Sequence, residues 1–458
     1  MARPKRTKET FPVLNPHAAG IDVGNEEVFV AIPEDADPNP VRHFPTFTQD
    51  LYILADWLKE KGIQTIAMES TGVYWIPLFQ ILEQRGFKVY LVNARDLNNV
   101  PGKTDVADCQ WIQYLHACGL LQASFRPEQA VCAVRTLLRH RDGLIRDAAS
   151  HIQHAQKAMT QMNLRLQNVI SDITGKTGLA ILDAILAGER NPKVLAELRD
   201  RRIRATEDTV IKSLEGDYRP EHIFTLRQAL GLYRTYQALI SECDAEIERM
   251  LSEFDSRGEP PADPSTGGPG KFKSTSGKMA GGNALHFKYS DMNSEVYRLY
   301  GTDLTLIPGM GALTLVTLFS EVGRDLSAFK SDKNFCSWLG LCPCNKVTGG
   351  KVISSRTNSV ASRAARAFRM AANGLWNNRS SLGDYHRRMS ARLGKQEAVT
   401  ATAHKLARIY YHLVQTRQSY DDSKFTRDEE AHRRKREARL RREAGRMGFD
   451  LVPQPTVT

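Results

Sequence analysis

Four acidic residues of this chain have the side-chain type and the sequence context to bind a divalent cation. Asp105 and Asp108 lie three residues apart in KTDVADC, at the start of a segment with helical apolar periodicity, so both carboxylates should lie on one helix face. Asp22 interrupts the apolar segment GIDVG, and Glu69 ends the apolar segment TIAME. An ionised carboxylate is costly to bury alone, and a metal ion would offset that cost for Asp22. Four hard oxygen donors favour Mg²⁺ or Mn²⁺ over zinc.

Two such ions about 4 Å apart could hold a phosphodiester, one activating the attacking oxygen and the other stabilising the leaving oxygen. For Asp105 and Asp108 alone, the simpler interpretation is a capped, solvated helix start, because short polar and acidic residues are favoured there. The metal hypothesis therefore depends on a fold that brings Asp22 and Glu69 to the same place.

The segments around these acids predict an α/β domain over residues 15–128. Two apolar segments flank the turn residues Gly24 and Asn25, a pattern typical of a β-hairpin, and residues 41–47 would add a third strand. The rest of the domain alternates helical and strand patterns. We therefore expect a mixed, helix-covered sheet. In a sheet of the ribonuclease-H type, the first and fourth strands would lie side by side, with the helix of the last two acids at their ends.

The remainder of the chain is expected to be mainly helical. Residues 129–254 repeat apolar residues at three- and four-residue steps, which predicts a long helical hairpin or coiled coil. Residues 255–296 are rich in Gly, Pro and Ser and predict a flexible linker. Residues 297–420 predict a C-terminal domain that begins with a helix-hairpin-helix-like segment, and residues 421–458 predict a basic tail.

The charge of the chain narrows the class of partner. A formal net charge of +11 favours a polyanion such as nucleic acid. No segment is apolar enough to span a bilayer, the basic N-terminus lacks the apolar core of a signal peptide, and the scattered cysteines do not predict disulfides. We expect a cytoplasmic, nucleoid-associated bacterial protein with no membrane partner.

Two glycine motifs in the C-terminal domain could bring backbone amides close to a phosphate. In LIPGMG, a tight turn separates two apolar segments, although packing alone could require the same glycines. In TGGK, the glycines remove side chains where the backbone would meet a phosphate, and the lysine can balance its charge. The residues expected to contact nucleic acid are Lys103, Gly309, Gly311, Gly349, Gly350, Lys351 and Arg356.

Taken together, the motifs resemble those of a known family. The order GIDVG, MEST, KTDVAD, a helical insert, LIPGMG, LGLCP, TGGK and RAARAFRMAA resembles the DEDD transposases of bridge-RNA-guided insertion sequences, which include the Piv-type DNA invertases. The resemblance implies a RuvC-like domain with Mg²⁺ or Mn²⁺ on the catalytic acids Asp22, Glu69, Asp105 and Asp108, and a C-terminal transposase domain with a nucleophilic serine. It also implies element-end and target DNA as substrates, a non-coding bridge RNA as a partner, and a homo-oligomer, either dimer or tetramer.

The chain departs from this family at the nucleophile. Thr348 stands where the family has the serine of an SGGK-like motif. The added methyl group crowds an attack on phosphorus and restricts the side chain at χ1. Three outcomes stay open: Thr348 is a slower nucleophile, Ser354 or Ser355 replaces it, or this copy is inactive. We expect Thr348 to be the nucleophile.

Three functions from different classes follow from these patterns. The leading hypothesis is a DNA transposase or site-specific recombinase that exchanges strands through a covalent hydroxyl–phosphate intermediate. A RuvC-like nuclease that hydrolyses structured DNA would need the four acids and no hydroxyl. A non-catalytic nucleic-acid scaffold would use the acids only to cap structure. A trapped protein–DNA adduct separates the first from the second, and binding without Mg²⁺-dependent cleavage would indicate the third.

Overall fold

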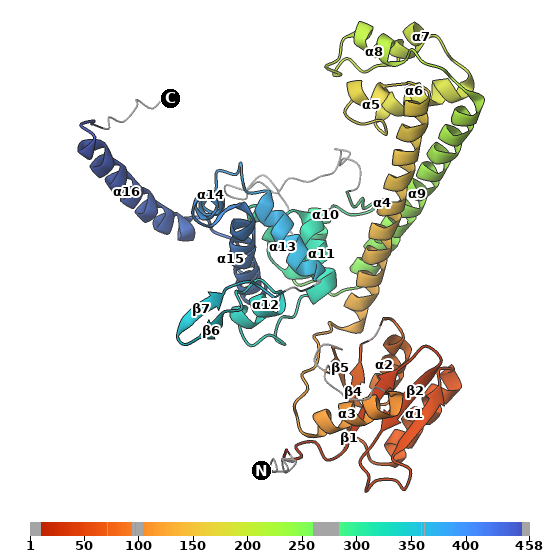
Figure 1. Ribbon diagram of the computed structural model, residues 1–458, viewed down its shortest axis with the longest axis vertical. Helices are drawn as coiled ribbons and strands as arrows, with labels where there is room; N and C mark the ends of the chain where they lie inside the picture. Colours follow the sequence, from red (N-terminus) through yellow and green to blue (C-terminus); the bar gives the residue numbers. More distant parts are fainter. Residues whose placement is uncertain are drawn as a thin grey trace, which may run out of the picture. The chain divides into compact units, whose positions relative to one another are not determined.

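The chain folds into two compact units, residues 1–126 and 127–458, in the computed structural model (Figure 1). Each unit has a hydrophobic core of its own. The structure describes residues 11–70, 72–93, 97, 104–259, 284–358, 360 and 362–450. None of the helices in these ranges combines the length and the hydropathy that a bilayer span requires.

The first unit is built on a five-stranded sheet. Its strands are, in spatial order, β3 (Val41–Pro45), β2 (Glu27–Ala31), β1 (Ala18–Val23), β4 (Thr65–Glu69) and β5 (Lys88–Val92). β1 pairs antiparallel with β2 and parallel with β4. The predicted mixed sheet, with its first and fourth strands side by side, is therefore confirmed.

Helices cover both faces of this sheet. α1 (Thr48–Glu60) and α2 (Trp75–Gln84) bury their apolar side chains against one face. α3 (Asp105–Ala117) covers the other face, where Ile112 packs in a cluster with Ala67 of β4. Successive strand side chains point to opposite faces, so the central strands need apolar residues at consecutive positions to fill both layers.

The second unit begins with a long helical hairpin. α4 (Gln129–Gln161) and α9 (Pro220–Ser252) pack side by side and antiparallel, and a buried ion pair between Arg141 and Asp244 joins them (Figure 1). Short helices lie between them in sequence: α5 (Leu166–Val169), α6 (Lys176–Ala187), α7 (Pro192–Glu197) and α8 (Glu207–Ser213). These form a hydrophobic core with one end of the long pair. The helical periodicity predicts the long pair but not this subdomain.

The rest of the second unit is mainly helical, as expected. In chain order its elements are α10 (Met292–Tyr300), the 3₁₀ helix η2 (Leu304–Leu306), α11 (Ala312–Val322), α12 (Asp332–Trp338), β6 (Lys346–Thr348), β7 (Lys351–Ser354), α13 (Arg363–Asn373), α14 (Ser381–Leu393), α15 (Lys395–Thr416) and α16 (Ser423–Arg446). Aromatic rings occupy its centre, where Phe335 stacks on Tyr410 and Phe368 meets Tyr410 edge-on. The hydroxyl groups of Tyr300 and Tyr410 share a hydrogen bond at 2.9 Å, so these buried polar groups are paired.

The predicted linker over residues 255–296 contains ordered structure. Residues 260–283 lie outside the described residues, and α10 begins within the predicted range, at Met292. Before α10, the carboxylate of Glu248 in α9 accepts hydrogen bonds from the backbone N–H groups of residues 288–290, at 2.6 to 2.8 Å. These contacts anchor the last part of the segment to α9, which a flexible linker would not require.

Candidate active site

Asp22 lies near the end of β1, on the face of the sheet that α3 covers. Two residues earlier on the same face, Gly20 lies directly against α3: a Cβ atom there would come within 2.1 Å of the Gln113 backbone nitrogen and 2.4 Å of the Cys109 carbonyl oxygen. Only glycine permits this approach of strand and helix. Gly20 is not predictable as a site residue from its motif, where its only signal is a small residue two positions before the acid.

Glu69 lies beside Asp22, at the carboxyl end of the neighbouring strand. The parallel register pairs Ile21 with Met68, so the next residues along the two strands, Asp22 and Glu69, are neighbours. Side chains of neighbouring residues in paired strands point from the same face. Both acids are half-buried. The sheet thus brings two carboxylates together from positions 47 residues apart in sequence.

Asp105 and Asp108 occupy the first turn of α3. Thr104 precedes them as the N-cap, and its hydroxyl accepts the backbone N–H of Ala107 at 3.2 Å. Capping therefore does not use either carboxylate. The positive end of the helix dipole favours negative charge at this turn.

The four acids share one electrostatic environment. The pKa of Asp22 is raised to about 6, first by burial and then by the charges of Glu69, Asp105 and Asp108. The buried Cys109 thiol has its pKa raised to about 12, mainly by burial and next by the charge of Asp22. A cation at this edge of the sheet would favour the ionised form of Asp22 and relieve the repulsion.

The donor set fits a hard divalent cation, because all four side chains offer carboxylate oxygens. Among the residues that the structure describes, no three His, Cys, Asp or Glu side chains are grouped closely enough to hold one ion. The backbone places the acids on adjoining elements, and ion binding would have to draw the side chains together.

Replacing Gly20 with alanine is expected to lower both the melting temperature and the rate of DNA cleavage. The new methyl group overlaps backbone atoms of α3, and overpacking of this kind costs about 1–3 kcal/mol. Any outward shift of α3 also moves Asp105 and Asp108 away from the strand acids. Thermal unfolding and a cleavage assay measure the two effects.

The Gly231→Ala variant is the matched control, since a Cβ atom there has no neighbouring atom within 4 Å and Gly231 lies inside α9. It should be as stable as the parent or slightly more so. A Gly20→Ala variant with unchanged stability and activity would contradict the close approach described here.

Thr348 lies at the tip of a β-hairpin. β6 and β7 pair antiparallel, with Thr348 opposite Lys351. Gly349 and Gly350 form the two-residue turn with φ of +55° and +76°, a conformation that favours glycine. All four residues are exposed, and a Cβ atom at either glycine would meet no neighbour. The motif TGGK therefore places the Thr348 hydroxyl and the positively charged Lys351 side by side at an exposed turn.

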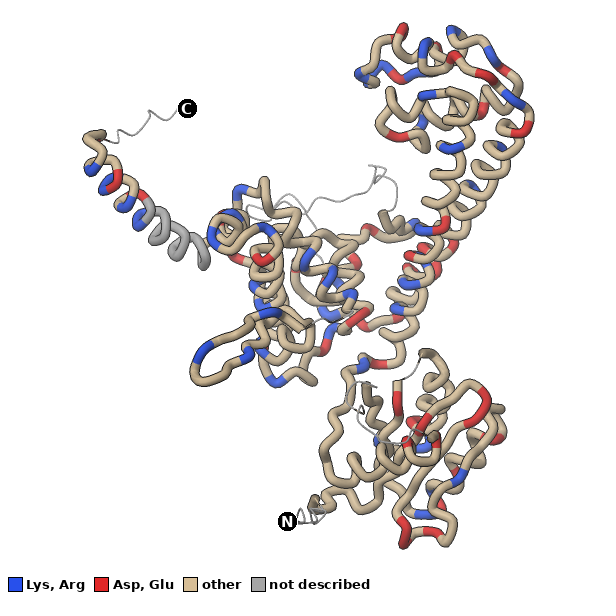
Figure 2. Tube along the Cα trace, in the orientation of Figure 1, with Lys and Arg blue, Asp and Glu red and all other residues tan. Residues whose placement is uncertain are grey.

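The alternative nucleophiles lie at the far end of the same hairpin. The Ser354 hydroxyl accepts the backbone N–H of Arg356 at 3.4 Å, and Ser355 is exposed. Arg356 is exposed as well, so the hairpin carries positive charge at both ends. Figure 2 shows further Lys and Arg residues along the described part of α16.

The two glycines of LIPGMG have different surroundings. Gly309 has φ of +86°, and a Cβ atom there would come within 2.7 Å of the Ala371 carbonyl oxygen. Its close approach is therefore to α13, and its expected contact with nucleic acid stays a prediction. Gly311 is the N-cap of α11 and faces open space, as a phosphate contact would require. Lys103 lies outside the described residues.

Comparisons with known proteins match two segments of the chain to family models. A family model described as a transposase, of the DEDD type of IS110, matches residues 19–164, a range that includes all four acids. A model of the transposase IS116/IS110/IS902 family matches residues 302–387, which include the β6–β7 hairpin. A comparison with curated proteins finds no match. The chain therefore carries IS110-family transposase domains, which support a DNA transposase or recombinase.

Proposed function

We propose that this protein cuts and rejoins the DNA of an insertion sequence through a covalent bond between Thr348 and a DNA phosphate. The observation that carries the proposal is that adjoining elements place four interacting acids at one edge of the sheet, within a chain that has IS110-family transposase domains. A carboxylate kept half-buried among three like charges is unfavourable for stability, and such arrangements are concentrated at functional sites.

The four acids would hold a divalent ion, and the ion would bind the DNA phosphate. Asp22 and Glu69 extend from strand ends, and Asp105 and Asp108 from the first turn of a helix, so rigid elements position all four. Bound Mg²⁺ or Mn²⁺ supplies positive charge for the oxygens around phosphorus. Gly20 sets the spacing between strand acids and helix acids, because it allows α3 to lie against β1.

Thr348 supplies the nucleophile. Its Oγ atom loses a proton and forms a bond to the scissile phosphorus, while the bond from phosphorus to the deoxyribose oxygen breaks and that oxygen takes up a proton. Attack by a second DNA hydroxyl reverses the step and rejoins the strands. The bare turn at Gly349 and Gly350 leaves room for a DNA strand, and Lys351 lies opposite the hydroxyl with a balancing charge.

A bridge RNA is proposed as a further partner, on the family resemblance and on charge. The net charge of +11 and the basic residues of α16 and the hairpin suit phosphate contacts. RNA held in this way should be lost steeply as the salt concentration rises, because each phosphate contact releases a bound counterion.

The helical hairpin is proposed to pair two subunits. α9 exposes Phe224, Leu232 and Leu239, whose spacing places them on one side of the helix. A double variant, Leu232→Lys with Leu239→Lys, should raise the dimer dissociation constant at least about a hundredfold. Each leucine buried in the dimer interface contributes about 1.5–3 kcal/mol. Sedimentation measures the change. Ser241→Lys is the control, because Ser241 is exposed on a different side of the same helix. An assembly that survives both leucine replacements would place the interface elsewhere.

The experiment that tests the function uses DNA from both sides of the reading frame. The full chain is incubated with nicked duplexes of this DNA and Mg²⁺, then denatured, and covalent protein–DNA adducts are resolved by size. An adduct in which peptide mapping locates the attached DNA on Thr348 supports the proposal. Cleavage without an adduct indicates a hydrolytic nuclease instead, and binding without cleavage indicates a scaffold.

A further inference from the structure

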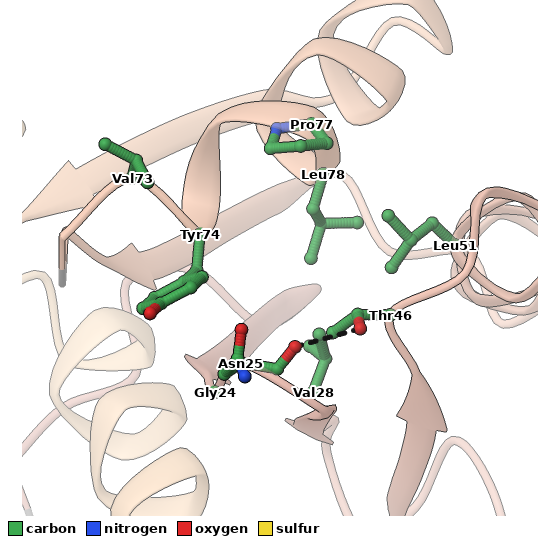
Figure 3. Close-up of a pocket in the computed structure, with 9 residues that line it drawn as sticks. All are labelled: Gly24, Asn25, Val28, Thr46, Leu51, Val73, Tyr74, Pro77 and Leu78. Carbon is green, nitrogen blue, oxygen red and sulfur yellow. Dashed lines mark hydrogen bonds between the residues drawn. The ribbon is translucent and has the colours of Figure 1, made fainter.

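A small pocket opens at the sheet edge where the candidate acids lie, with a cavity volume of about 240 Å³ (Figure 3). It lies on the α1 and α2 side of the sheet, whereas Asp22 faces α3. The residues that line it are Gly24, Asn25, Val28, Thr46, Leu51, Val73, Tyr74, Pro77 and Leu78.

The walls of the pocket are apolar and one of them is aromatic. Leu51 and Leu78 are buried beneath it, whereas Tyr74 is 47% exposed and Val73 is 66% exposed. No lining residue carries a charge, which disfavours a phosphate or a carboxylate as the group bound inside. The pocket therefore fits a neutral, flat group that can pack against the tyrosine ring.

Two polar groups at the rim could orient such a group. The Thr46 hydroxyl donates to the backbone carbonyl of Asn25 at 3.0 Å, which holds the β1–β2 turn against the start of α1 (Figure 3). The exposed side-chain amide of Asn25 lies on the same rim and offers both a donor and an acceptor.

The chain connects this pocket directly to the candidate acids. Gly24 follows Asp22 by two residues, a distance of about 7 Å along a strand. Val73 follows Glu69 by four residues, through the loop that leads from β4 to α2. A DNA strand whose phosphate lies at the acids therefore has a neighbouring nucleotide within reach of the pocket.

We propose that this pocket takes one unstacked nucleobase of the DNA strand that is cut, next to the scissile phosphate; this inference rests on the function proposed above. Its volume is below the roughly 300–1,000 Å³ of sites for drug-sized ligands, so a single heterocycle is the appropriate size. Stacking on Tyr74 accepts any base, because every base has a π-face. Holding that base out of the stack fixes the adjacent phosphate relative to Asp22.

Photocrosslinking tests the proposal in the full-length protein. The probe is a short single-stranded oligonucleotide of mixed sequence with one 5-iodouracil, a base that crosslinks to aromatic side chains under long-wavelength ultraviolet light. We expect the crosslinked peptide to contain Tyr74. Tyr74→Ala should weaken binding of this oligonucleotide about 5- to 150-fold, the range for stacking one base on an aromatic ring. Tyr74→Phe should retain both the crosslink and the binding.

Tyr52→Ala is the matched control, because Tyr52 is an exposed aromatic residue of α1 that packs on Arg85 and does not line the pocket. Melting temperatures show that each variant folds. Crosslinks that map away from Tyr74, together with unchanged binding by Tyr74→Ala, would overturn the proposal. So would a crosslink of Tyr74 to a second copy of the chain in place of DNA.

The adduct assay separates this inference from the proposed function. A Thr348 adduct without a Tyr74 crosslink refutes the base pocket alone. A Tyr74 crosslink in a protein that cleaves no DNA refutes the recombinase function and supports the pocket as a nucleobase site.

Discussion

The Asp22→Asn variant is expected to lose DNA cleavage by about three orders of magnitude or more and to be more stable than the parent at neutral pH. Loss of a metal-binding carboxylate removes several kcal/mol of charge stabilisation from the cleavage step, and each 1.4 kcal/mol is a tenfold change in rate. The same replacement relieves the burial cost and the like-charge repulsion that raise the pKa of Asp22. A gain in stability with a loss of activity distinguishes a functional acid from a structural one.

The raised pKa of Asp22 also predicts how the stability difference between variant and parent changes with pH. The pKa of Asp22 is raised from 3.8 to about 6 in the folded protein. Between these values the folded state binds more protons than the unfolded state, so the parent loses stability as the pH rises through the window. The asparagine variant lacks this loss. The difference in melting temperature between variant and parent should therefore be smallest below pH 4 and largest above pH 6.

Asp35→Asn is the control for removing a negative charge from the first unit, because Asp35 is an exposed acid in the β2–β3 loop. It should cleave DNA like the parent and show the pH dependence of the parent. An Asp22→Asn variant that cleaves normally would remove Asp22 from the site, whatever its stability.

Replacing Thr348 with alanine is expected to eliminate the covalent protein–DNA adduct and recombination. Serine at this position should keep or raise both, because it removes only the methyl group that crowds the attack. Thr348→Val keeps the branched shape without the hydroxyl and should be as inactive as alanine. All three variants should fold like the parent, since the hairpin tip is exposed and surface replacements change stability by about 0.5 kcal/mol or less.

The Ser354→Ala and Ser355→Ala variants complete this series. Both should still form the adduct, since neither serine is the expected nucleophile. Recombination by Thr348→Ala together with its loss in either serine variant would transfer the role to that serine. DNA cleavage by Thr348→Ala with no adduct in any variant would favour hydrolysis.

The elements of the first unit were predictable because their signals are local. Turn residues Gly24 and Asn25 separate two apolar strands, and the alternation of helical and strand patterns leads to a parallel pair. Placing Asp22 and Glu69 together needed only the strand order, since the carboxyl ends of parallel neighbours meet at one edge of a sheet. The lone charge inside an apolar strand made Asp22 a candidate site residue.

The long helices were predictable for the same reason, but the end of the predicted linker was not. Apolar residues at three- and four-residue steps define α4 and α9. The linker was predicted from its Gly-, Pro- and Ser-rich composition. That composition contains no information about Glu248, whose carboxylate accepts hydrogen bonds from the backbone N–H groups of residues 288–290. The composition of a segment cannot indicate a hydrogen-bond acceptor that lies elsewhere in the sequence.

The sequence by itself therefore determined the α/β and helical classes, and it made the four acids and the hydroxyl of Thr348 the candidate site groups. The tertiary structure decided that Gly20 meets Gln113, that Gly309 packs on Ala371, and that Tyr74 lines a pocket at the edge of the sheet. These features come from contacts between residues far apart in the chain, whose closeness depends on how whole elements pack. Local propensity and periodicity report which face of an element is apolar, and they do not report which atoms of another element that face will meet.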